Sequence, residues 1–471
     1  MPRTNINISR KDITWSYVAK FFSLATGLII MPFVLHMLSP EEVGMNYLMA
    51  TVSSIVMLID FGFGPQFGRN FSYVSSGAQA LLKEGVEHNE SGEVNYRLLA
   101  VLLKTARKVY SRLSLTALSI MLTAGTVYIY FVTDRFTSVP GALWIWLIYS
   151  VSVFFNFYYS YYTTLLTGSG MIAESSKATI LTRAVQIVLN VAMLYMGMGL
   201  FAVVIANLLA PFVQRFYCYK VYFTPELKAK TAFAITKEEI SETFRTIWYN
   251  ARRLGINLVG SYAINKLGLF LVGLYLPLAV SGSFGLLIQL STIISGVAVI
   301  LTNSYMPVFS NYRVTGQTEE LKGLFSFSML VYWAITIAGI LAVVFLGEPA
   351  LSLIRSKTQL PAASLCAVYL LVTALEGNHS LFASLITTKN EVPFVEAGLI
   401  SGGIIALLTF LSLQFTSLGL WGVVLIQGLV QLCYNNWYWP RWVLKDLDVS
   451  LPKFVQYGFN HLKTLKNGKK H

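Results

Sequence analysis

Two lysines lie inside long apolar stretches of the chain, where a charged group is energetically costly. Lys266 lies in the middle of SYAINKLGLFLVGLYLP (residues 261–277), and Lys20 lies in SYVAKFFSLATGLIIMP (residues 16–32). In both stretches a glycine follows the lysine by seven residues, and a proline marks the far end. At 1.5 Å per residue, both ammonium groups would lie at a similar depth, about 17–18 Å below that end. A lysine near the centre of a bilayer costs about 2.5–3.5 kcal/mol, so we expect each to face an anion or a polar cavity.

Further polar side chains recur at helical spacing. Arg183, Gln186 and Asn190 share one face at i, i+3 and i+7, and Gln427 and Gln431 share another, while a third polar face begins at Gln289. Two interpretations stay open for each face, namely hydrogen bonds between helices or the lining of a polar lumen. Arg183 and Arg215 are predicted only one to two turns inside their spans, so either could instead extend toward the inner surface.

Acidic groups within the apolar stretches are few, with Asp60 and Glu376 the candidates. Either could form a structural ion pair with an intramembrane lysine. Glu376 and His379 are spaced i, i+3, which also fits a proton-coupling site. The alternative for this pair is a polar kink at Gly377.

Composition assigns the chain to the integral membrane proteins. Of its 471 residues 55% are hydrophobic and 12% charged, and the mean hydropathy is +0.60; soluble domains average about 25% charged residues. The three cysteines form no CxxC pair, so we expect neither a disulfide framework nor a metal site. No nucleotide-binding loop, HExxH sequence or nucleophile elbow is present. We therefore expect no enzyme activity and no cofactor.

Windows of about 20 apolar residues predict twelve transmembrane helices. They cover residues 13–37, 43–65, 113–133, 141–167, 176–197, 199–221, 251–275, 278–304, 327–346, 361–387, 394–415 and 418–441. Because six spans precede the segment 222–246 and six follow it, the halves would form a parallel repeat about the membrane normal. We predict an all-α protein with a first six-helix lobe (1–221), a linker (222–246), a second six-helix lobe (247–444) and a basic tail (445–471).

The basic residues predict the orientation. With both termini in the cytoplasm, 28 of the 35 Lys and Arg residues fall in cytoplasmic segments or at the cytoplasmic ends of spans, and three fall in outer loops. This distribution explains most of the net charge of +13 without nucleic acid. Residues 66–112 contain a basic amphipathic stretch expected to lie on the inner membrane surface. Thr236 and Glu239 form a capping box that should open an amphipathic helix in the linker.

Several short stretches resemble a known family. They are Leu38-Ser39-Pro40-Glu41-Glu42-x-Gly44, Asp60-Phe61-Gly62, Arg69, and the stretches 270–290 and 306–325 in the second half. Together they resemble the O-antigen (Wzx-type) flippases of the multidrug/oligosaccharidyl-lipid/polysaccharide (MOP) exporter superfamily. The resemblance implies two six-helix lobes around a central cavity. It also implies transport of undecaprenyl-pyrophosphate-linked oligosaccharide between the leaflets of a bacterial inner membrane by alternating access. The chain shows no thirteenth and fourteenth spans of the kind that lipid II flippases carry.

Under this resemblance the polar residues divide into four groups. The pyrophosphate would meet Lys20, Lys266 and Arg183, and the cytoplasmic mouth would be lined by Arg69, Arg252, Arg253 and Arg215. The polar lumen would contain Gln186, Asn190, Gln289, Gln427 and Gln431, and coupling would use Glu376, His379 and Asp60. Expected partners are the lipid-linked substrate, membrane lipids, and the polysaccharide polymerase and glycosyltransferases of the same pathway.

Two other functional classes would require different sequence features. A cation-coupled exporter of small molecules or drugs from the same superfamily would need acidic residues in its lumen, whereas this chain supplies mainly basic ones. A polysaccharide polymerase or other membrane glycosyltransferase would need a large outer catalytic loop, and the predicted outer loops are too short for one.

Overall fold

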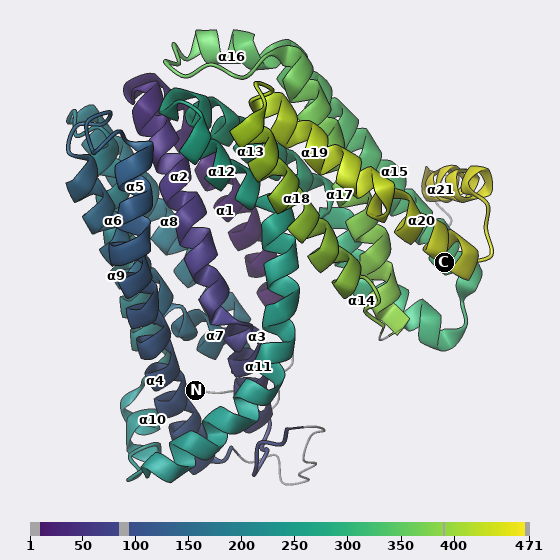
Figure 1. Ribbon diagram of the computed structural model, residues 1–471. Coiled ribbons are helices and arrows are strands. Elements are labelled where there is room, and N and C mark those ends of the chain that lie inside the picture. The colour runs from purple at the N-terminus through teal and green to yellow at the C-terminus, as the bar shows by residue number, and fades with distance from the viewer. Residues whose placement is uncertain (1–9, 84–93, 390, 467–471) are drawn as a thin grey trace. The chain divides into compact units, whose positions relative to one another are not determined.

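The computed structural model describes residues 10–83, 94–389 and 391–466, and it contains helices and no strand within those residues (Figure 1). The chain packs as two compact units, Met1–Val259 and Gly260–His471, here called lobe 1 and lobe 2. The boundary between them falls inside one helix, α11.

Lobe 1 is built from the first eleven α-helices. Its longest helices pack side by side, with α8 against both α1 and α9 and with α6 against α4 and α9. The helices are α1 (Arg10–Met37), α2 (Pro40–Met57), α3 (Phe63–Ser75), α4 (Tyr96–Ile120), α5 (Thr126–Val132), α6 (Ala142–Tyr159), α7 (Tyr161–Gly168), α8 (Ile172–Tyr195), α9 (Leu200–Tyr222), α10 (Pro225–Lys230) and α11 (Lys237–Asn265).

Lobe 2 contains the remaining helices around an apolar core that includes Phe325, Tyr332 and Phe382. Part of the predicted tail belongs to this core, because Phe454 of α21 packs on Phe325 and its carbonyl accepts a hydrogen bond from Ser326. The helices are α12 (Leu267–Tyr275), α13 (Leu278–Ala298), α14 (Ile300–Thr315), α15 (Thr318–Leu341), α16 (Gly347–Leu353), α17 (Ala363–Ile386), α18 (Val395–Phe415), α19 (Leu420–Cys433), α20 (Asn435–Asp446) and α21 (Leu451–Lys466).

Within the described residues, ten helical segments are long and apolar enough to cross a membrane, against the twelve predicted. The two predicted spans outside this set, 251–275 and 418–441, are interrupted helices. Lys266 separates α11 from α12, and Tyr434, with φ −143° and ψ −65°, separates α19 from α20. Each break divides an apolar stretch into pieces that are individually shorter than a span.

The basic amphipathic stretch continues directly into a helix long enough to span a membrane, and the amphipathic linker helix also runs on past its predicted end. The basic stretch that begins at Tyr96 forms the first turns of α4, whose helical path reaches Val132 through α5. The linker helix α11 likewise does not end at residue 246 but runs on to Asn265. No glycine or proline occurs from Tyr96 to Ala124 or from Lys237 to Leu254, so no residue breaks either helix.

The two lobes repeat unusual backbone features at corresponding places. The third long span of each half contains a five-residue π-helical turn, Met121–Gly125 in lobe 1 and Ala342–Leu346 in lobe 2. The loop before α9 and the loop before α19 each end on a glycine, and the two glycines have nearly equal backbone angles. Gly199 has φ 56° and ψ −141°, and Gly419 has φ 52° and ψ −128°. These shared details support a parallel internal repeat.

The two glycines give a matched stability prediction. Only glycine adopts this backbone region without strain, so Gly419→Ala should lower the free energy of unfolding by about 1–3 kcal/mol. Gly199→Ala should lower the free energy of unfolding further, because its new Cβ would lie 2.7 Å from Oε1 of Glu42. That carboxylate accepts hydrogen bonds from the backbone amides of Leu200 and Ser39. Thermal unfolding of the purified protein in detergent measures both losses.

The control for this comparison is Gly403→Ala on α18, where nothing lies within 4 Å of the added Cβ. Alanine favours a helix over glycine, so this variant should be no less stable than the native chain. Equal losses for the alanine variants of Gly199 and Gly419 would contradict the role given to Glu42.

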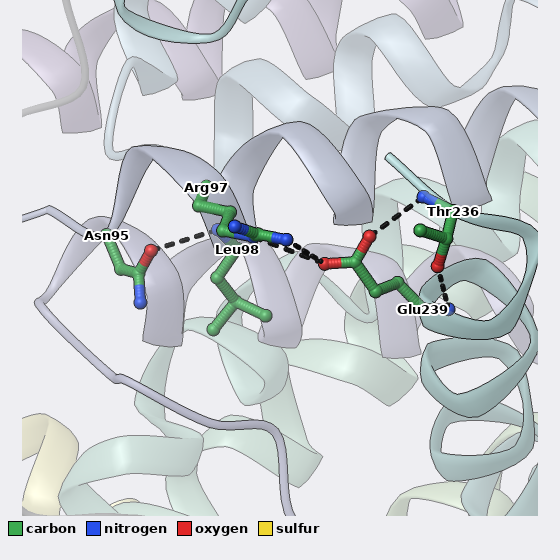
Figure 2. A network of polar contacts seen from close by, with 5 residues as sticks. All are labelled: Asn95, Arg97, Leu98, Thr236 and Glu239. Carbon is green, nitrogen blue, oxygen red and sulfur yellow. Dashed lines mark hydrogen bonds and ion pairs between the residues drawn. The ribbon is translucent and has the colours of Figure 1, made fainter. Parts of the chain in front are cut away.

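The start of α11 is fixed to the start of α4 by a small polar network (Figure 2). Thr236 and Glu239 form the predicted capping box, with Thr236 N donating to Glu239 Oε2 at 2.8 Å and Glu239 N donating to Thr236 Oγ1 at 3.2 Å. Arg97 donates from both Nε and a terminal nitrogen to Oε1 of the same carboxylate, at 3.2 and 2.9 Å. Asn95 caps α4 by accepting from Leu98 N at 2.9 Å. One carboxylate therefore stabilises its own helix and ties it to a second one.

This network predicts a pH-dependent helix start. Hydrogen bonding by the Thr236 backbone amide, and then by Arg97, lowers the pKa of Glu239 below its ordinary 4.5. A lowered carboxyl pKa stabilises the folded form above pH 4.5, and the contribution is lost as pH falls through the folded value. Hydrogen exchange of the first turn of α11, corrected for intrinsic rates, should show less protection at pH 3.5 than at pH 6. Glu239→Gln should remove this difference; a native-sized difference in that variant would contradict the assignment.

Candidate functional site

A small polar pocket lies within lobe 1, between α6, α8 and α9. Its volume is about 90 Å³, and its wall contains four amide side chains, two threonines and one guanidinium. The helices that form it pack side by side (Figure 1). The lining residues are Asn156, Thr179, Thr182, Arg183, Gln186, Asn207, Ala210 and Gln214. No carboxylate is among them, so the wall carries a net positive charge.

Hydrogen bonds hold the pocket side chains in a row. An Nη1 of Arg183 donates to Gln186 Oε1 at 2.7 Å, and Gln186 Nε2 donates to Asn207 Oδ1 at 2.5 Å. Asn156 Nδ2 donates across the pocket to the backbone carbonyl of Asn207 at 3.3 Å. Since Gln186 accepts from Arg183 and donates to Asn207, the row orients the guanidinium while its remaining N–H groups stay available.

Arg183 lies much deeper in its helix than the sequence suggested. It is eleven residues from the start of α8 at Ile172 and twelve from its end at Tyr195, or about 17–18 Å from each. The helix therefore extends beyond Arg183 on its inner side by more than the predicted one to two turns. The exposed apolar side chains Leu181 (41%) and Val188 (66%) point to the opposite side of the helix, 140–160° away. Arg183 thus opens into the pocket rather than toward the apolar flank of α8.

The third member of the α8 face, Asn190, does not line this pocket. Its side chain is 1% exposed, and its Oδ1 has no hydrogen-bond partner within the described residues. Of the predicted face, the structure therefore brings together Arg183 and Gln186. The pocket residues Asn207 and Gln214 come from α9, where their i, i+7 spacing places them on one face.

The two intramembrane lysines do not occupy equivalent places. Lys20 lies on the continuous helix α1, seventeen residues before its end at Met37, whereas Lys266 lies nine residues before the end of α12. These separations correspond to about 26 Å and 14 Å along the helices, so the two lysines differ in their distance from the helix end. The reason is that Pro32 lies inside α1 while Pro277 follows α12. Within the described residues, neither ammonium is paired with a carboxylate.

The residues predicted for the cytoplasmic mouth are mostly exposed. Arg69 is exposed on α3, and Arg252 is exposed on α11 with its guanidinium 5.4 Å from the Tyr249 ring. Arg215 stacks over two rings, those of Tyr159 at 5.4 Å and Tyr219 at 6.0 Å. The side chain of Arg253 lies outside the described residues.

Lobe 2 holds a buried carboxylate. Glu376 is 8% exposed near the middle of α17 and accepts a hydrogen bond from Gln427 Nε2 on α19 at 2.9 Å. His379 binds a different partner, with Nδ1 2.7 Å from Oδ1 of Asn436. The helix is continuous at Gly377, and a side chain there would collide with the Tyr332 hydroxyl, which donates to Ala374 O. This glycine therefore provides close packing within a continuous helix.

A second polar network lies beside the break at Tyr434. Asn435 Nδ2 donates to Gln431 Oε1 at 2.7 Å and to Ser401 Oγ at 2.9 Å, and Asn435 Oδ1 accepts from Trp439 at 2.9 Å. Gln431 is fully buried, and its Nε2 has no partner within the described residues. Gln289 lies half-buried on α13. Glu376, Gln427 and this network show that lobe 2 also has a polar interior.

Asp60 has a clear local role. Its Oδ2 accepts from the backbone amide of Gly64 at 3.1 Å, in the first turn of α3. A carboxylate at a helix start satisfies an amide that has no partner in the helix and interacts favourably with the helix dipole. Asp60 therefore links the end of α2 to α3.

The fold can be compared with solved structures. The lipid II flippase MurJ in an inward closed conformation superposes with a TM-score of 0.62, at 14% identity, over 97% of this chain and 93% of its own. An outward-facing multidrug resistance MATE family transporter gives 0.57 at 13% identity, covering 93% and 95%. A MOP superfamily transporter from Pyrococcus furiosus Vc1, described as having a binding pocket of reverse polarity, gives 0.54 at 15% identity, covering 96% and 99%. The chain has the MOP transporter fold.

The MOP transporter fold agrees with the all-helical, two-lobe architecture predicted from the sequence. The solved structures named above are described as transporters and a flippase, and ten helical segments among the described residues of this chain are long and apolar enough to cross a membrane. No protein-family model matches the chain, and no curated protein matches it. Because MOP structures include both a lipid flippase and drug exporters, the substrate must be argued from the side chains.

Proposed function

We propose that this protein is a flippase for undecaprenyl-pyrophosphate-linked oligosaccharide, the repeat unit of an O-antigen or capsule. It would move the lipid from the cytoplasmic to the periplasmic leaflet of a bacterial inner membrane by alternating access, with both termini in the cytoplasm. The observation that carries the proposal is the lobe 1 pocket, in which Arg183 lies at mid-helix among amides and hydroxyls with no carboxylate in the wall.

The pyrophosphate is the part of the substrate that most needs a polar, positively charged site. Its charges must cross an apolar slab, where an uncompensated anion is very costly. The guanidinium of Arg183 can donate two parallel hydrogen bonds to phosphate oxygens, and the nearby amide N–H groups can donate further ones. The cavity volume of about 90 Å³ suits a phosphate group rather than a sugar chain. Lys20 and Lys266 would add positive charge along the path, and Arg69, Arg215, Arg252 and Arg253 would attract the anion at its entrance.

A small number of cations is also compatible with release. A site that bound pyrophosphate through many fixed arginines would hold it too tightly for transport. Here Arg183 has one fixed hydrogen-bond partner, Gln186, and the lysines have flexible stems and no carboxylate partner among the described residues. The lumen amides Gln186, Asn190, Gln289, Gln427 and Gln431 would provide neutral polar contacts.

Glu376 is our proposed coupling residue. Its carboxyl group is buried at mid-helix and has one neutral hydrogen-bond partner, so it can bind a proton or cation without breaking an ion pair. His379 and Asp60, the other predicted coupling residues, are bound to Asn436 and to the start of α3. Coupling at Glu376 would link transport to an ion gradient.

The alternative is a cation-coupled exporter of small molecules or drugs, and two observations favour it over other classes. MATE transporters share the fold, and Glu376 provides a buried acid. A cationic drug would nevertheless be repelled by the lobe 1 pocket, whose only charged group is a guanidinium. The flippase therefore fits the side chains better.

Gene deletion in the native host separates the two functions. A flippase predicts loss of the surface polysaccharide and accumulation of the lipid-linked repeat unit on the cytoplasmic leaflet. The glycosyltransferases of the pathway would still build the repeat unit up to that step, whereas the polymerase would lack its substrate. Normal surface polysaccharide together with increased sensitivity to cationic drugs would overturn the proposal and favour the exporter.

A further inference from the structure

A second cavity in lobe 1 lies outside the polar pocket, between α4 and the first half of α11. It is a groove of about 350 Å³ with a mostly apolar wall. From α4 it is lined by Val109 and Leu113, and from α11 by Ile240. A groove of this volume falls in the range of small-ligand sites. None of the roles assigned above uses it.

Aromatic rings form one side of this groove. Phe63 stacks on Phe244 and on Trp248, with ring centroids 6.0 and 5.6 Å apart. Phe63 is buried, but Phe244 and Trp248 remain 37% and 38% exposed. Two large rings that are packed at one face and open at the other offer a surface for an apolar chain.

Two cations lie on the α4 side of the groove. Lys108 and Arg112 are one helical turn apart on α4, and both line the groove. No carboxylate lines it, and within the described residues neither cation forms an ion pair. Arg97 on the same helix differs, since it is paired with Glu239. These two cations can therefore bind an anion that the described residues do not supply.

The groove lies at the expected level of lipid headgroups. The helical path through α4 and α5 ends at Val132, and a hydrocarbon core of about 30 Å takes about 20 residues of helix. Counting back from Val132 places the other core boundary near Leu113, with Arg112 and Lys108 just outside it. Phe63 reaches the same level independently, because it follows the membrane-spanning segment Pro40–Asp60 by three residues.

We propose that this groove binds an anionic glycerophospholipid, with the phosphate on Lys108 and Arg112 and one acyl chain along the aromatic side. Basic pockets between membrane helices take anionic headgroups, and the rings supply the apolar contact. The site is separate from the Arg183 pocket and does not depend on what the protein transports. Because α11 forms one wall and continues into the break at Lys266, bound lipid would also hold this helix against α4.

The test uses the purified full chain in mild detergent with chain-brominated lipids, which quench nearby tryptophans. Brominated phosphatidylglycerol should quench the native protein more strongly, and at lower concentration, than brominated phosphatidylcholine. Trp248→Phe should remove the phosphatidylglycerol-specific part of the quenching. Lys108→Ala/Arg112→Ala should weaken the apparent phosphatidylglycerol affinity about tenfold or more. Lys220→Ala/Arg245→Ala removes two exposed cations outside the groove and should bind like the native chain.

Three results would overturn the proposal. The first is equal quenching by the two lipids, which would indicate non-selective contact with the apolar belt. The second is an unchanged phosphatidylglycerol affinity in Lys108→Ala/Arg112→Ala when near-native quenching by phosphatidylcholine shows that this variant is folded. The third is full displacement of phosphatidylglycerol by millimolar inorganic phosphate, which would identify a free-anion site in place of a lipid site.

Discussion

Replacing Arg183 with glutamine is expected to lower transport of a pyrophosphate-linked lipid by about 10- to 100-fold. A hydrogen bond to a charged group contributes about 1.5–3 kcal/mol, and the guanidinium is the only charged group in the pocket wall. Glutamine retains a polar side chain but loses the charge. Transport is measured as the initial rate at which a fluorescent lipid-linked oligosaccharide becomes accessible at the far leaflet of reconstituted vesicles.

Two further variants make this result specific. Arg183→Lys keeps the charge but not the planar pair of donors, so its rate should fall between those of the native chain and the glutamine variant. Arg245→Gln removes an exposed arginine of α11 that lies outside the pocket and should transport normally. If Arg183→Gln transported at the native rate, the lobe 1 pocket would not be the pyrophosphate site.

Replacing Glu376 with glutamine should abolish the response of transport to a proton gradient. One pH unit can drive about tenfold accumulation for each coupled proton, and this gain should disappear. The fold should survive, because the glutamine carbonyl can accept the same hydrogen bond from Gln427 that the carboxylate accepts now. Substrate movement in vesicles with and without an imposed pH gradient gives the measurement.

An alanine variant separates coupling from packing at the same position. Glu376→Ala leaves the buried amide of Gln427 without its acceptor, which should cost about 1–3 kcal/mol of folding free energy and lower the thermal midpoint. Glu396→Gln changes an exposed carboxylate on α18 and should affect neither property. A normal gradient response in Glu376→Gln would show that this carboxyl group has only a structural role.

Much of the fold was predictable because the length of each apolar stretch and the glycine-containing loops between the stretches are local signals. The sequence GMG between α8 and α9 and the sequence TSLG between α18 and α19 marked two real connections, each ending at a positive-φ glycine. The capping box at Thr236 was confirmed atom by atom. These features depend on a few neighbouring residues, so a sequence can reveal them directly.

Predictions differed from the structure where a local residue pattern suggested a helix boundary but the helix continues. The amphipathic pattern at the start of α4 suggested a helix lying on the membrane, and the pattern at the start of α11 suggested a helix confined to the linker. Neither sequence contains a residue that would end the helix there. Lys20 and Lys266 looked equivalent because their spacing to a proline is similar. Their distances from the helix end differ because a proline can lie inside a helix, as in α1, or after one, as beyond α12.

The candidate site was predictable only along single helices. Periodicity on α8 identified Arg183 and Gln186 together, but it could not show that Asn156 from α6 and Asn207 from α9 complete the pocket. In lobe 2, the partner of His379 is Asn436, 57 residues away in the sequence. Contacts between helices depend on how the faces pack, and a single sequence does not encode that packing in any short pattern.

Transport by the purified protein in vesicles tests the central proposal most directly. Native protein and the Arg183→Gln variant would be compared with two substrates, a fluorescent polyprenyl-pyrophosphate oligosaccharide and a cationic dye. We predict that the native protein moves the pyrophosphate lipid and not the dye, and that Arg183→Gln loses lipid transport. Transport of the dye without the lipid, or lipid transport that is unaffected by Arg183→Gln, would contradict the proposed function.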